Sequence, residues 1–404
     1  MKLNTIDLFA GCGGLTDGFK ASGNFNLLAA VEWDLHAINT LRNRLKTKYN
    51  YKNPSEVAIH FDIQKTDELL NGFEGNIEFK PFDGLNKLVG NKNVDVIIGG
   101  PPCQAYSVAG RIRDDNGMHD DYRNFLFESY LRVVNHFKPP VCIFENVPGM
   151  LSAKPGGILI LERILSAFRD CGYDVSEKLG VNGVFNCSEF GVPQNRKRVI
   201  IIAIRKDVPN SSKVIEEFYS ELNSKKSVCV PTVKDAISDL PKLFPIKYSQ
   251  KKKSHEANKQ VNIYNHIPRF HNSRDIEIFK LLASDIEEPR NEYCNAEKLK
   301  ELYTQKTGKT SSVHKYYVLR WDKPSNTIPA HLYKDGLRHI HPDPLQARSI
   351  TVREAARFQS FSDDYEFLSS SGANYKMIGN AVPPLFAKEI AESVQTIFHS
   401  KIKQ

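Results

Sequence analysis

Cys103 is the residue of this sequence best placed for nucleophilic chemistry. It follows Gly99-Gly100-Pro101-Pro102, which comes directly after the apolar run 94–98. Two glycines and two prolines restrict the backbone there, and doubly wound sheets bind ligands at the carboxyl ends of their strands. Most single cysteines are inert core residues, as we predict for Cys142 inside an apolar run. The position of Cys103 instead predicts a reactive thiol.

Glu145 is the candidate acid to work beside that thiol. It ends another apolar run, so a parallel sheet would bring its carboxyl group to the same edge as Cys103. A carboxyl group at a sheet edge is often an ordinary loop residue, and only the thiol singles this one out. Arg196 and Arg198 precede the apolar run 199–204 and would point the same way if that strand extends back to them. They would then bind an anion or lower the pKa of a thiol; the alternative is a solvated strand end.

A glycine-rich loop separates a predicted strand, residues 5–9, from a predicted helix that ends near residue 21. Its glycines stand at positions 11, 13 and 14. Such a loop lets the backbone lie against a ligand, and the helix N-terminus offers unpaired N–H groups. The dinucleotide fingerprint requires a further glycine where this chain has Thr16, so the loop is not shaped for a pyrophosphate.

Glu32 and Trp33 complete this first candidate site. Glu32 ends a second predicted strand, 27–31, and lies about 20 residues beyond the loop, where an acidic side chain reaches a ribose diol. Trp33 would stack on a flat base. The predicted ligand is therefore nucleoside-like and lacks a diphosphate.

Apolar strands alternate with amphipathic helices over the first 205 residues, as in the helix expected at 35–45. Repeated strand–helix–strand units imply a parallel sheet with helices on both faces. Further on, Thr351 and Glu354 form a capping box for a helix that ends at Phe358, and a turn at 378–384 precedes a last helix that ends near residue 398.

The composition is that of an ordinary globular protein. The 404 residues include 41% hydrophobic and 25% charged residues, which excludes a disordered chain. The longest aliphatic run, 199–204, is too short to cross a bilayer, and no signal peptide is evident. Seven cysteines without a Cys-x-x-Cys motif argue against a disulfide scaffold and a structural zinc site. We expect a cytoplasmic protein.

Basic residues concentrate in one part of the chain. The formal net charge is +8, and residues 206–323 contain 22 Lys and Arg against 16 Asp and Glu. Periodicity is poor there, which predicts a separate, loop-rich module. Within 242–274 there are eight basic residues and one acidic residue, and we expect this stretch to bind phosphates. Its interleaved aromatic and histidine residues are Tyr248, His255, Tyr264, His266, Phe270 and His271.

Six motifs in a fixed order give the chain its resemblance to a known family. It resembles the DNA (cytosine-5) methyltransferases of the bacterial type II modification-methylase type. The match covers about 1–205 and 318–404, and the unmatched 206–317 corresponds to the variable target-recognition region of that family. The motifs are Asp7 to Gly14 (DLFAGCGG), Gly99 to Ser107 (GGPPCQAYS), Glu145-Asn146-Val147, Gln194-Asn195-Arg196-Lys197-Arg198, Arg348 to Phe361 (RSITVREAARFQSF) and Gly379-Asn380-Ala381-Val382.

Three positions depart from the family pattern. The usual Gly-Asp-Ile is Phe61-Asp62-Ile63, a common Phe is Tyr106, and a frequent Phe-Pro-Asp is Phe361-Ser362-Asp363. Each keeps the side chain expected to touch a ligand or a close analogue of it.

The resemblance implies a fold and a domain organisation. The fold is an α/β, Rossmann-like S-adenosylmethionine-dependent methyltransferase fold with a mostly parallel, doubly wound sheet and a smaller, loop-rich target-recognition domain. We expect the catalytic, cofactor-binding domain at 1–205 and 374–404, the target-recognition domain at 206–340, and a motif-bearing helix and hinge region at 341–373.

The resemblance also implies the chemistry. Carbon 5 of cytosine is too weak a nucleophile to attack a methyl donor, so the Cys103 thiolate would first add to carbon 6. Glu145 would hydrogen-bond or protonate ring nitrogen 3. Arg198 would contact the cytosine or nearby backbone, and Arg196 would support the pocket. The target base would be flipped out of the duplex at a cost of a few kcal/mol.

Ligand contacts follow from the motif matches. S-adenosylmethionine is the implied methyl donor and no metal is expected. Double-stranded DNA is the implied partner, a cognate restriction endonuclease acting on the same site is a further one, and we expect a monomer. The implied cofactor-binding residues are Phe9, Gly11, Gly13, Gly14, Leu15, Glu32, Trp33, Asp62, Ile63, Pro102, Asn380 and Val382, and the implied DNA-binding residues are Gln104, Ser107, Arg111 and Arg113.

Three alternatives compete with this interpretation. The first is a tRNA cytosine-5 methyltransferase from the same family, but that branch carries Cys-Phe-Thr where residues 185–188 are Phe-Asn-Cys-Ser, and a long basic segment follows here. The second is a catalytically inactive DNA-binding relative, which the intact Cys103, Glu145 and glycine loop disfavour. The third is a nicotinamide dehydrogenase, which Thr16 and the Pro-Pro-Cys site disfavour.

Overall fold

The chain folds into two compact units. The computed structural model describes residues 2–102, 126–154, 157–250, 253–257, 262–334 and 336–402. Unit 1 comprises Met1–Gly191, Arg196–Cys229 and Ala381–Gln404, and unit 2 comprises Val192–Asn195 and Val230–Asn380.

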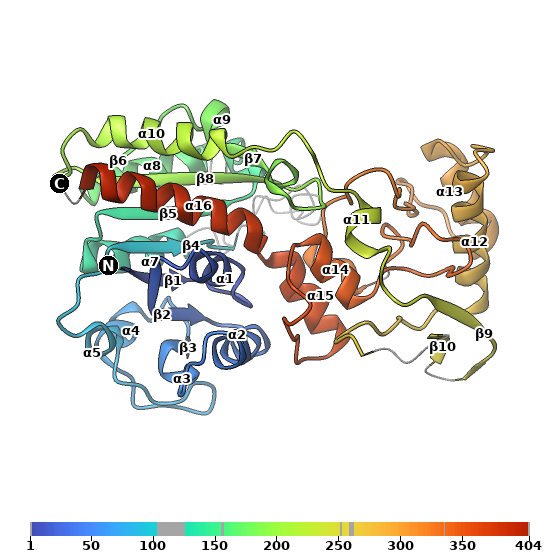
Figure 1. The fold of residues 1–404 in the computed structure, drawn as a ribbon, viewed down its shortest axis with the longest axis horizontal. Helices are drawn as coiled ribbons and strands as arrows, with labels where there is room; N and C mark the ends of the chain where they lie inside the picture. The colour runs from blue at the N-terminus through green and yellow to red at the C-terminus, as the bar shows by residue number, and fades with distance from the viewer. Residues whose placement is uncertain are drawn as a thin grey trace. The chain divides into compact units, whose positions relative to one another are not determined.

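A central β-sheet organises unit 1 (Figure 1). Its strands are β1 (Leu3–Leu8), β2 (Phe25–Glu32), β3 (Ala58–His60), β4 (Val96–Gly99), β5 (Val141–Asn146), β6 (Tyr173–Val175), β7 (Val184–Asn186) and β8 (Lys197–Arg205). The order is β3-β2-β1-β4-β5-β8-β6, and β7 pairs with β8. Most of these strands are buried on both faces, which explains their nearly continuous apolar sequences.

The first five strands of that order are parallel, as the sequence predicts. The chain winds from β1 to β2 and β3 on one side, whereas β4 and β5 lie on the other side of β1. Right-handed crossovers in opposite directions place α1 (Gly14–Ala21) and α7 (Leu126–Phe137) on opposite faces. The expected doubly wound, mostly parallel sheet is therefore confirmed.

Strand β8 departs from the expected parallel arrangement. It pairs antiparallel with β5, β6 and β7. No crossover helix of the usual length separates β7 from β8; only a short 3₁₀ turn, η4 (Cys187–Phe190), and a loop do so. A parallel connection needs a dozen or more residues, so this short link returns the chain antiparallel.

Helices flank the sheet, and α16 (Pro384–Ile397), drawn in red, passes in front of the strands in Figure 1. It contacts α1 and α10 (Ser211–Ser224). The other helices of unit 1 are α2 (Leu35–Thr47), α3 (Pro54–Val57), α4 (Thr66–Asn71), α5 (Leu85–Val89), α8 (Ile160–Asp170) and α9 (Leu179–Asn182), with the shorter η2 (Pro148–Leu151) and η6 (Phe398–Ile402).

Glycines allow α1 and α16 to approach closely. A Cβ atom at Gly14 would overlap the carbonyl oxygen of Val382, and one at Gly18 would overlap the Cβ of Ala387. Val382, just before α16, and the first turn of α16 therefore pack against α1, the helix that follows the glycine loop.

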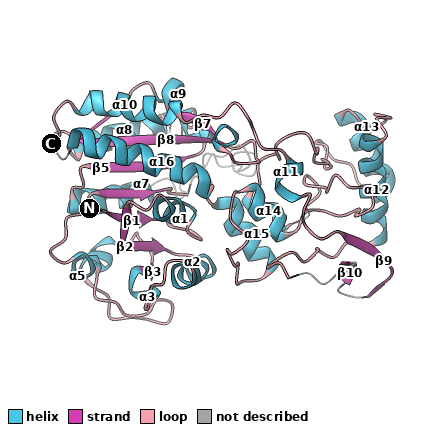
Figure 2. Ribbon diagram, viewed as in Figure 1, coloured by secondary structure: helices cyan, strands magenta, loops and turns pink. Residues whose placement is uncertain are grey.

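Unit 2 is richer in loops than unit 1, as Figure 2 shows, but it also contains helices that the poor sequence periodicity did not predict. Its core gathers Ile278, Phe279 and Leu282 around Tyr316 and Ile340. The elements are α11 (Val233–Ile237), β9 (Leu243–Gln250), β10 (Lys253–Ala257), α12 (Ser273–Glu287), α13 (Ala296–Thr307), η5 (Ala330–Tyr333), α14 (Val352–Phe358) and α15 (Ser371–Asn380).

Two local predictions in this unit have different outcomes. The capping box is confirmed, because the Thr351 hydroxyl accepts from the Glu354 N–H and the Glu354 carboxylate accepts from the Thr351 N–H. The predicted turn at 378–384 is wrong in its first half, because Ile378 and Asn380 belong to α15. Across the described part of the chain, no helix is long and apolar enough to span a membrane.

Candidate active site

The carboxyl edge of the sheet in unit 1 gathers most of the predicted ligand-binding residues. The strand order reverses between β1 and β4, and a crevice at such a switch point is where open α/β sheets bind ligands. The glycine loop follows β1, and Gly100-Pro101-Pro102 follows β4. Because β1 and β4 are paired neighbours, these two loops leave the sheet side by side.

The glycine loop adopts left-handed backbone conformations. Phe9, Gly11 and Gly13 have φ angles of 61°, 57° and 94°. A Cβ atom at Gly11 would meet nothing within 4 Å, so the loop has an open side there. Gly13 is the N-cap of α1 and has no side chain to cap that helix end. The loop therefore exposes backbone to a ligand beside a helix N-terminus, as the sequence analysis expected.

Glu32 supports this loop. Its Oε2 accepts a hydrogen bond from the Gly11 N–H at 2.8 Å, and its Oε1 accepts one from the Asp34 N–H at 2.7 Å. Burial raises the pKa of Glu32, and these backbone hydrogen bonds oppose the rise. A carboxylate has about four lone pairs, and the backbone N–H groups of Gly11, Asp34 and Trp33 occupy three of them, so the side chain can still accept from one ribose hydroxyl.

The remaining predicted base-contacting residues follow β2 and β3, which are adjacent strands. Trp33 is 59% exposed, which leaves its ring free to stack on a base. Ile63 is buried, and the Asp62 carboxylate accepts from the Gln64 N–H at 3.0 Å. The structure therefore brings Glu32, Trp33, Asp62 and Ile63 to one edge of the sheet.

Two further cofactor candidates fall in different units. Val382 lies in unit 1, and its carbonyl group packs on Gly14 of α1. Leu15, the next residue of α1, is buried. Asn380 is the last residue of α15, which belongs to unit 2.

Glu145 lies at the second candidate site, at the end of β5. Its carboxyl group is 90% buried and forms an ion pair with Arg198, with 2.7 Å between Oε1 and Nε. A Cβ atom at Gly100 would lie 2.8 Å from Glu145 Oε2, so the carboxyl group faces the loop that leads to Cys103. Burial raises the pKa of Glu145, and Arg198 and Arg196 oppose this rise.

The two arginines have different surroundings. Arg196 is almost fully buried, donates to the Ala381 carbonyl oxygen at 3.0 Å, and has its pKa lowered to about 9 by burial. Strand β8 begins at Lys197, one residue after Arg196. Arg198 is thus positioned by the strand and Arg196 by the loop before it.

Asn146 is a structural contributor that the sequence analysis did not select. Its side-chain amide lies 3.4 Å from the Pro101 carbonyl oxygen, and its side-chain oxygen accepts from the Val147 N–H at 2.7 Å. It therefore links the end of β5 to the loop after β4. Its position beside Glu145 in the Glu-Asn-Val motif was the available signal.

The predicted nucleophile and DNA contacts lie outside the described residues. These residues are Cys103, Gln104, Ser107, Arg111 and Arg113. Pro102, immediately before them, is described and exposed. Cys142 is fully buried in β5, which confirms its assignment to the core.

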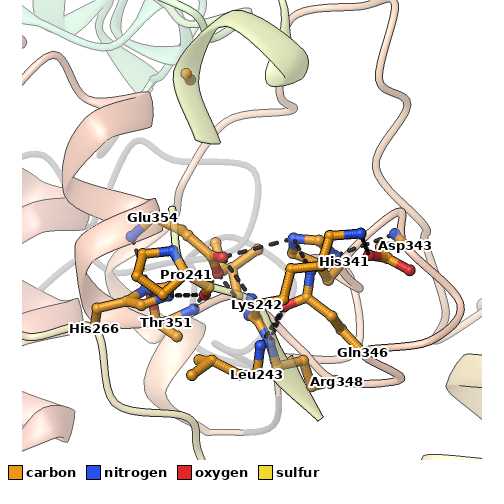
Figure 3. Close-up of polar contacts among 12 residues, drawn as sticks. Pro241, Lys242, Leu243, His266, His341, Asp343, Gln346, Arg348, Thr351 and Glu354 are labelled. Atoms are coloured by element: carbon orange, nitrogen blue, oxygen red, sulfur yellow. Dashed lines mark hydrogen bonds and ion pairs between the residues drawn. The ribbon is translucent and has the colours of Figure 1, made fainter. Parts of the chain in front are cut away.

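The motif at 348–361 forms a buried polar frame in unit 2 (Figure 3). Arg348 forms a two-pronged ion pair with Glu354, with both N–O distances at 2.7 Å. His266 lies against the Thr351 hydroxyl and the Pro241 carbonyl oxygen. These side chains hold α14 in place through their contacts with one another.

The three histidines of the basic stretch 242–274 are also part of this interior. His255, His266 and His271 are each less than 5% exposed. These three side chains therefore lie in the interior of unit 2 and are not part of a surface that could bind phosphates. The histidines bond to neighbouring protein groups, as His255 does with the Gln346 carbonyl oxygen at 3.0 Å, whereas Tyr264 and Phe270 are exposed.

No group of three or more potential metal-binding side chains occurs among the residues that the structure describes. The first candidate site is formed by a glycine loop, and the second contains a buried acid with an adjacent arginine.

Two solved structures share this fold. A prophage-encoded protein of E. coli, described as a DNA modification methyltransferase, matches 99% of this chain and 100% of its own with a TM-score of 0.62 and 22% identity. The S. pombe Dnmt2 methyltransferase matches 99% of both chains with a TM-score of 0.54 and 16% identity. The fold is that of S-adenosylmethionine-dependent methyltransferases.

Sequence comparison identifies the family within this class. The sequence model of the C-5 cytosine-specific DNA methylases matches residues 3–74 and 76–396. The type II methyltransferase M.Bpa9945I of Bacillus paralicheniformis is 34% identical over 456 residues, covering 98% of this chain and 99% of that protein. M.DdeI of Desulfomicrobium norvegicum is 31% identical, covering 98% and 90%.

The chain belongs to the C-5 cytosine-specific DNA methylase family. It is a DNA (cytosine-5) methyltransferase of the type II restriction–modification type. The resemblance that the six motifs indicated is confirmed, and the dehydrogenase alternative is excluded.

Proposed function

We propose that this enzyme transfers a methyl group from S-adenosylmethionine to carbon 5 of a cytosine within a specific double-stranded DNA sequence. The observation that carries the proposal is the placement of Glu145. Its buried carboxyl group lies against Gly100, three residues before Cys103, and is held by Arg198. An acid in this position can donate a proton to a cytosine ring that reacts with the neighbouring thiol.

The residues after β1 and β2 fit the cofactor. S-adenosylmethionine is a nucleoside without a diphosphate, and it supplies an electrophilic methyl group. The open side of the loop at Gly11 would receive it, Glu32 would bind the ribose, and Trp33, Asp62 and Ile63 would flank the adenine. Phe9, Gly13, Gly14, Leu15, Pro102, Asn380 and Val382 complete the proposed cofactor-binding set.

Cys103 would activate the cytosine. Its thiolate forms a bond to carbon 6, and the ring electrons move to carbon 5, which becomes nucleophilic enough to take the methyl group. The methyl–sulfur bond of the donor would break in this step, and S-adenosylhomocysteine would leave. A base then removes the proton from carbon 5, and the carbon–sulfur bond breaks to release the thiolate. The ring leaves this sequence aromatic again, with the methyl group in place of one proton.

Glu145 would handle the proton at ring nitrogen 3. As the thiolate adds, the protonated carboxyl group donates its proton to that nitrogen, and it recovers the proton when the thiolate leaves. Burial supports this role because it raises the pKa of Glu145 and so keeps the acid protonated at a higher pH. Arg198 would hold the carboxyl group in place and contact the cytosine, while Arg196 supports the pocket.

The target base must leave the duplex to reach this site. Residues 104–124, with Gln104, Ser107, Arg111 and Arg113, would close over the flipped base. We assign catalysis to 1–205 and 374–404, DNA recognition to 206–340, and a hinge role to 341–373. The excess of 22 basic over 16 acidic residues in 206–323 supports a polyanionic partner.

The same proposal extends to the biological setting. As relatives of the chain are named type II methyltransferases, we propose that this enzyme protects the sites of a cognate restriction endonuclease. It would act as a monomer in the bacterial cytoplasm, where it meets the chromosome.

Radiolabelled methyl transfer tests the proposal. Purified enzyme and its Cys103→Ser variant would be incubated with tritiated S-adenosylmethionine and either PCR-amplified, unmethylated genomic DNA or tRNA. We expect label in DNA with the wild-type enzyme alone and none in tRNA. Label in tRNA but not in DNA, or in neither, would overturn the proposal.

A further inference from the structure

Thr16 stands where the dinucleotide fingerprint would have a glycine, and its side chain has a specific partner. Its hydroxyl group donates a hydrogen bond to Asp7 Oδ2 at 2.5 Å. Both residues are buried, with exposures of 1% and 0%. Asp7 lies in β1 and Thr16 in the first turn of α1, so this hydrogen bond spans the entire glycine loop.

Asp7 occupies the centre of the sheet at the point where the strand order reverses. It is in register with Ala30 on β2 and Ile98 on β4. Its second oxygen, Oδ1, has no hydrogen-bond partner among the described residues. Burial raises the pKa of Asp7 to about 7, against the opposing effect of hydrogen bonds from Thr16. A buried carboxyl group with one oxygen unsatisfied is costly, so its position calls for an explanation.

The conformation of the glycine loop supplies that explanation. The loop is tied at two places: Gly11 N–H to Glu32 near its tip, and Thr16 to Asp7 at its base. Between these ties, Phe9 has a left-handed backbone, which is unfavourable for a residue with a side chain. The N-cap residue Gly13 has no side chain to cap α1, and the Asp7 carboxylate also accepts a hydrogen bond from the Thr16 N–H in the first turn of that helix. The Asp7–Thr16 hydrogen bond therefore fixes the spacing between the strand end and the helix start.

We propose that Asp7 and Thr16 are positioning residues for the cofactor, which hold residues 9–13 in the conformation that binds S-adenosylmethionine. The inference rests on the proposed function, because it takes this loop to be the cofactor site. The pair acts through the loop backbone, and neither side chain needs to touch the ligand. Thr16 thus does more than replace a glycine: its hydroxyl closes the loop.

The test compares Thr16→Val, which is nearly isosteric and lacks the hydroxyl group, with Thr5→Val. Thr5 is a matched control, because it is a buried threonine on β1 whose hydroxyl has no hydrogen-bond partner among the described residues. Isothermal titration calorimetry would measure the Kd for S-adenosylmethionine without DNA. We expect Thr16→Val to raise this Kd about tenfold, the effect of losing one buried hydrogen bond. Thr5→Val should bind like the wild type, and Thr16→Ser should restore most of the affinity.

Steady-state kinetics separate positioning from a merely structural role. We expect Thr16→Val to raise the KM for S-adenosylmethionine. When S-adenosylmethionine is saturating, kcat and the KM for DNA should equal those of the wild type. A lower melting temperature with an unchanged Kd would overturn the inference, as would equal Kd values for Thr16→Val and Thr5→Val. If Thr16→Val does not fold, Thr16→Ala provides the same comparison with less steric demand. If the wild-type enzyme itself does not bind S-adenosylmethionine, it is the proposed function that fails.

Discussion

Glu145 is subject to two opposing influences at the scale of the single residue. Burial raises its pKa, and the nearby Arg198 and Arg196 lower it; burial has the larger effect. Glu145 therefore lies beside the Arg198 cation, and yet its pKa stays above the usual value of a glutamate. This balance suits a group that must give up a proton and recover it in each turnover.

Removal of the acid function should impair catalysis more than binding. We expect Glu145→Gln to lower kcat by roughly 10²- to 10⁴-fold, the usual contribution of a general acid, with the Kd for S-adenosylmethionine unchanged. Glu189→Gln is the control, since it removes the same charge from a half-exposed residue that pairs with Lys226. A kcat within a few-fold of the wild type would contradict the role assigned to Glu145.

The pH profile tests the influence of Arg198 on Glu145. In the proposed mechanism the catalytic form of Glu145 is protonated, so activity should fall as the pH rises through its pKa. Arg198 lowers that pKa, so Arg198→Met should raise it and move the alkaline limb of the kcat profile to higher pH. Arg205→Met, at the other end of β8, should leave the limb in place. A shift of the limb to lower pH in Arg198→Met would show that Glu145 does not control it.

Most of the proposed site residues could be identified from the sequence, but their hydrogen bonds and their burial could not be predicted from it. The acid at position 145 and the glycine loop are recognisable because local motifs at strand ends carry them. The bond between Glu32 and Gly11 joins residues 21 positions apart and depends on strand pairing. The three histidines of the basic stretch look like surface residues in one dimension, and only tertiary packing buries them.

At the scale of elements, the contact between α1 and α16 depends on missing side chains. A Cβ at Gly18 would overlap the Cβ of Ala387, so Gly18→Ala should lower the free energy of unfolding by about 1–3 kcal/mol through overpacking. Gly180→Ala is the control, because a Cβ there meets nothing within 4 Å and the loss of backbone entropy in the unfolded chain favours alanine. Urea denaturation of both variants checks this. Equal stabilities would show that the helices adjust without cost.

Strand prediction succeeded where buried strands are continuous apolar runs, as in β5 and β8. The direction of β8 could not be predicted, because it depends on the length of the connection from β7. Helix α15 was missed because Gly372 and Gly379 lower its intrinsic helix propensity. The structure accounts for Gly379, since a Cβ there would lie 2.5 Å from the Ala330 nitrogen.

At the scale of the whole molecule, the buried histidines make unit 2 sensitive to acid. Burial lowers the pKa of His255 to about 4 and those of His271, His339 and His341 to about 3. The folded state therefore binds fewer protons than the unfolded state between these values and about 6.5. The stability of unit 2 is fully present above pH 6.5 and is lost as the pH falls below it, by at most about 1.4 kcal/mol per pH unit for each histidine.

Trp321 can report this loss, because its ring packs edge-on against His341 with 5.5 Å between centroids. The chain has two tryptophans, so a Trp33→Phe variant leaves Trp321 as its single tryptophan, in unit 2. We expect the urea midpoint of its fluorescence transition to fall as the pH is lowered from 7.5 to 5. His36→Gln, which removes an exposed histidine of unit 1, should not change this trend. An unchanged midpoint would contradict the neutral, buried state of the histidines.

Covalent trapping tests the central claim most directly. In DNA that carries 5-fluorocytosine at the target position, carbon 5 bears fluorine, so no proton can be removed and the adduct cannot resolve. With S-adenosylmethionine present, we expect a protein–DNA complex that survives denaturant, with peptide mapping that places the bond at Cys103. The Cys103→Ser variant should form none. A wild-type enzyme that methylates ordinary DNA but forms no complex, or a complex that persists in Cys103→Ser, would contradict the account.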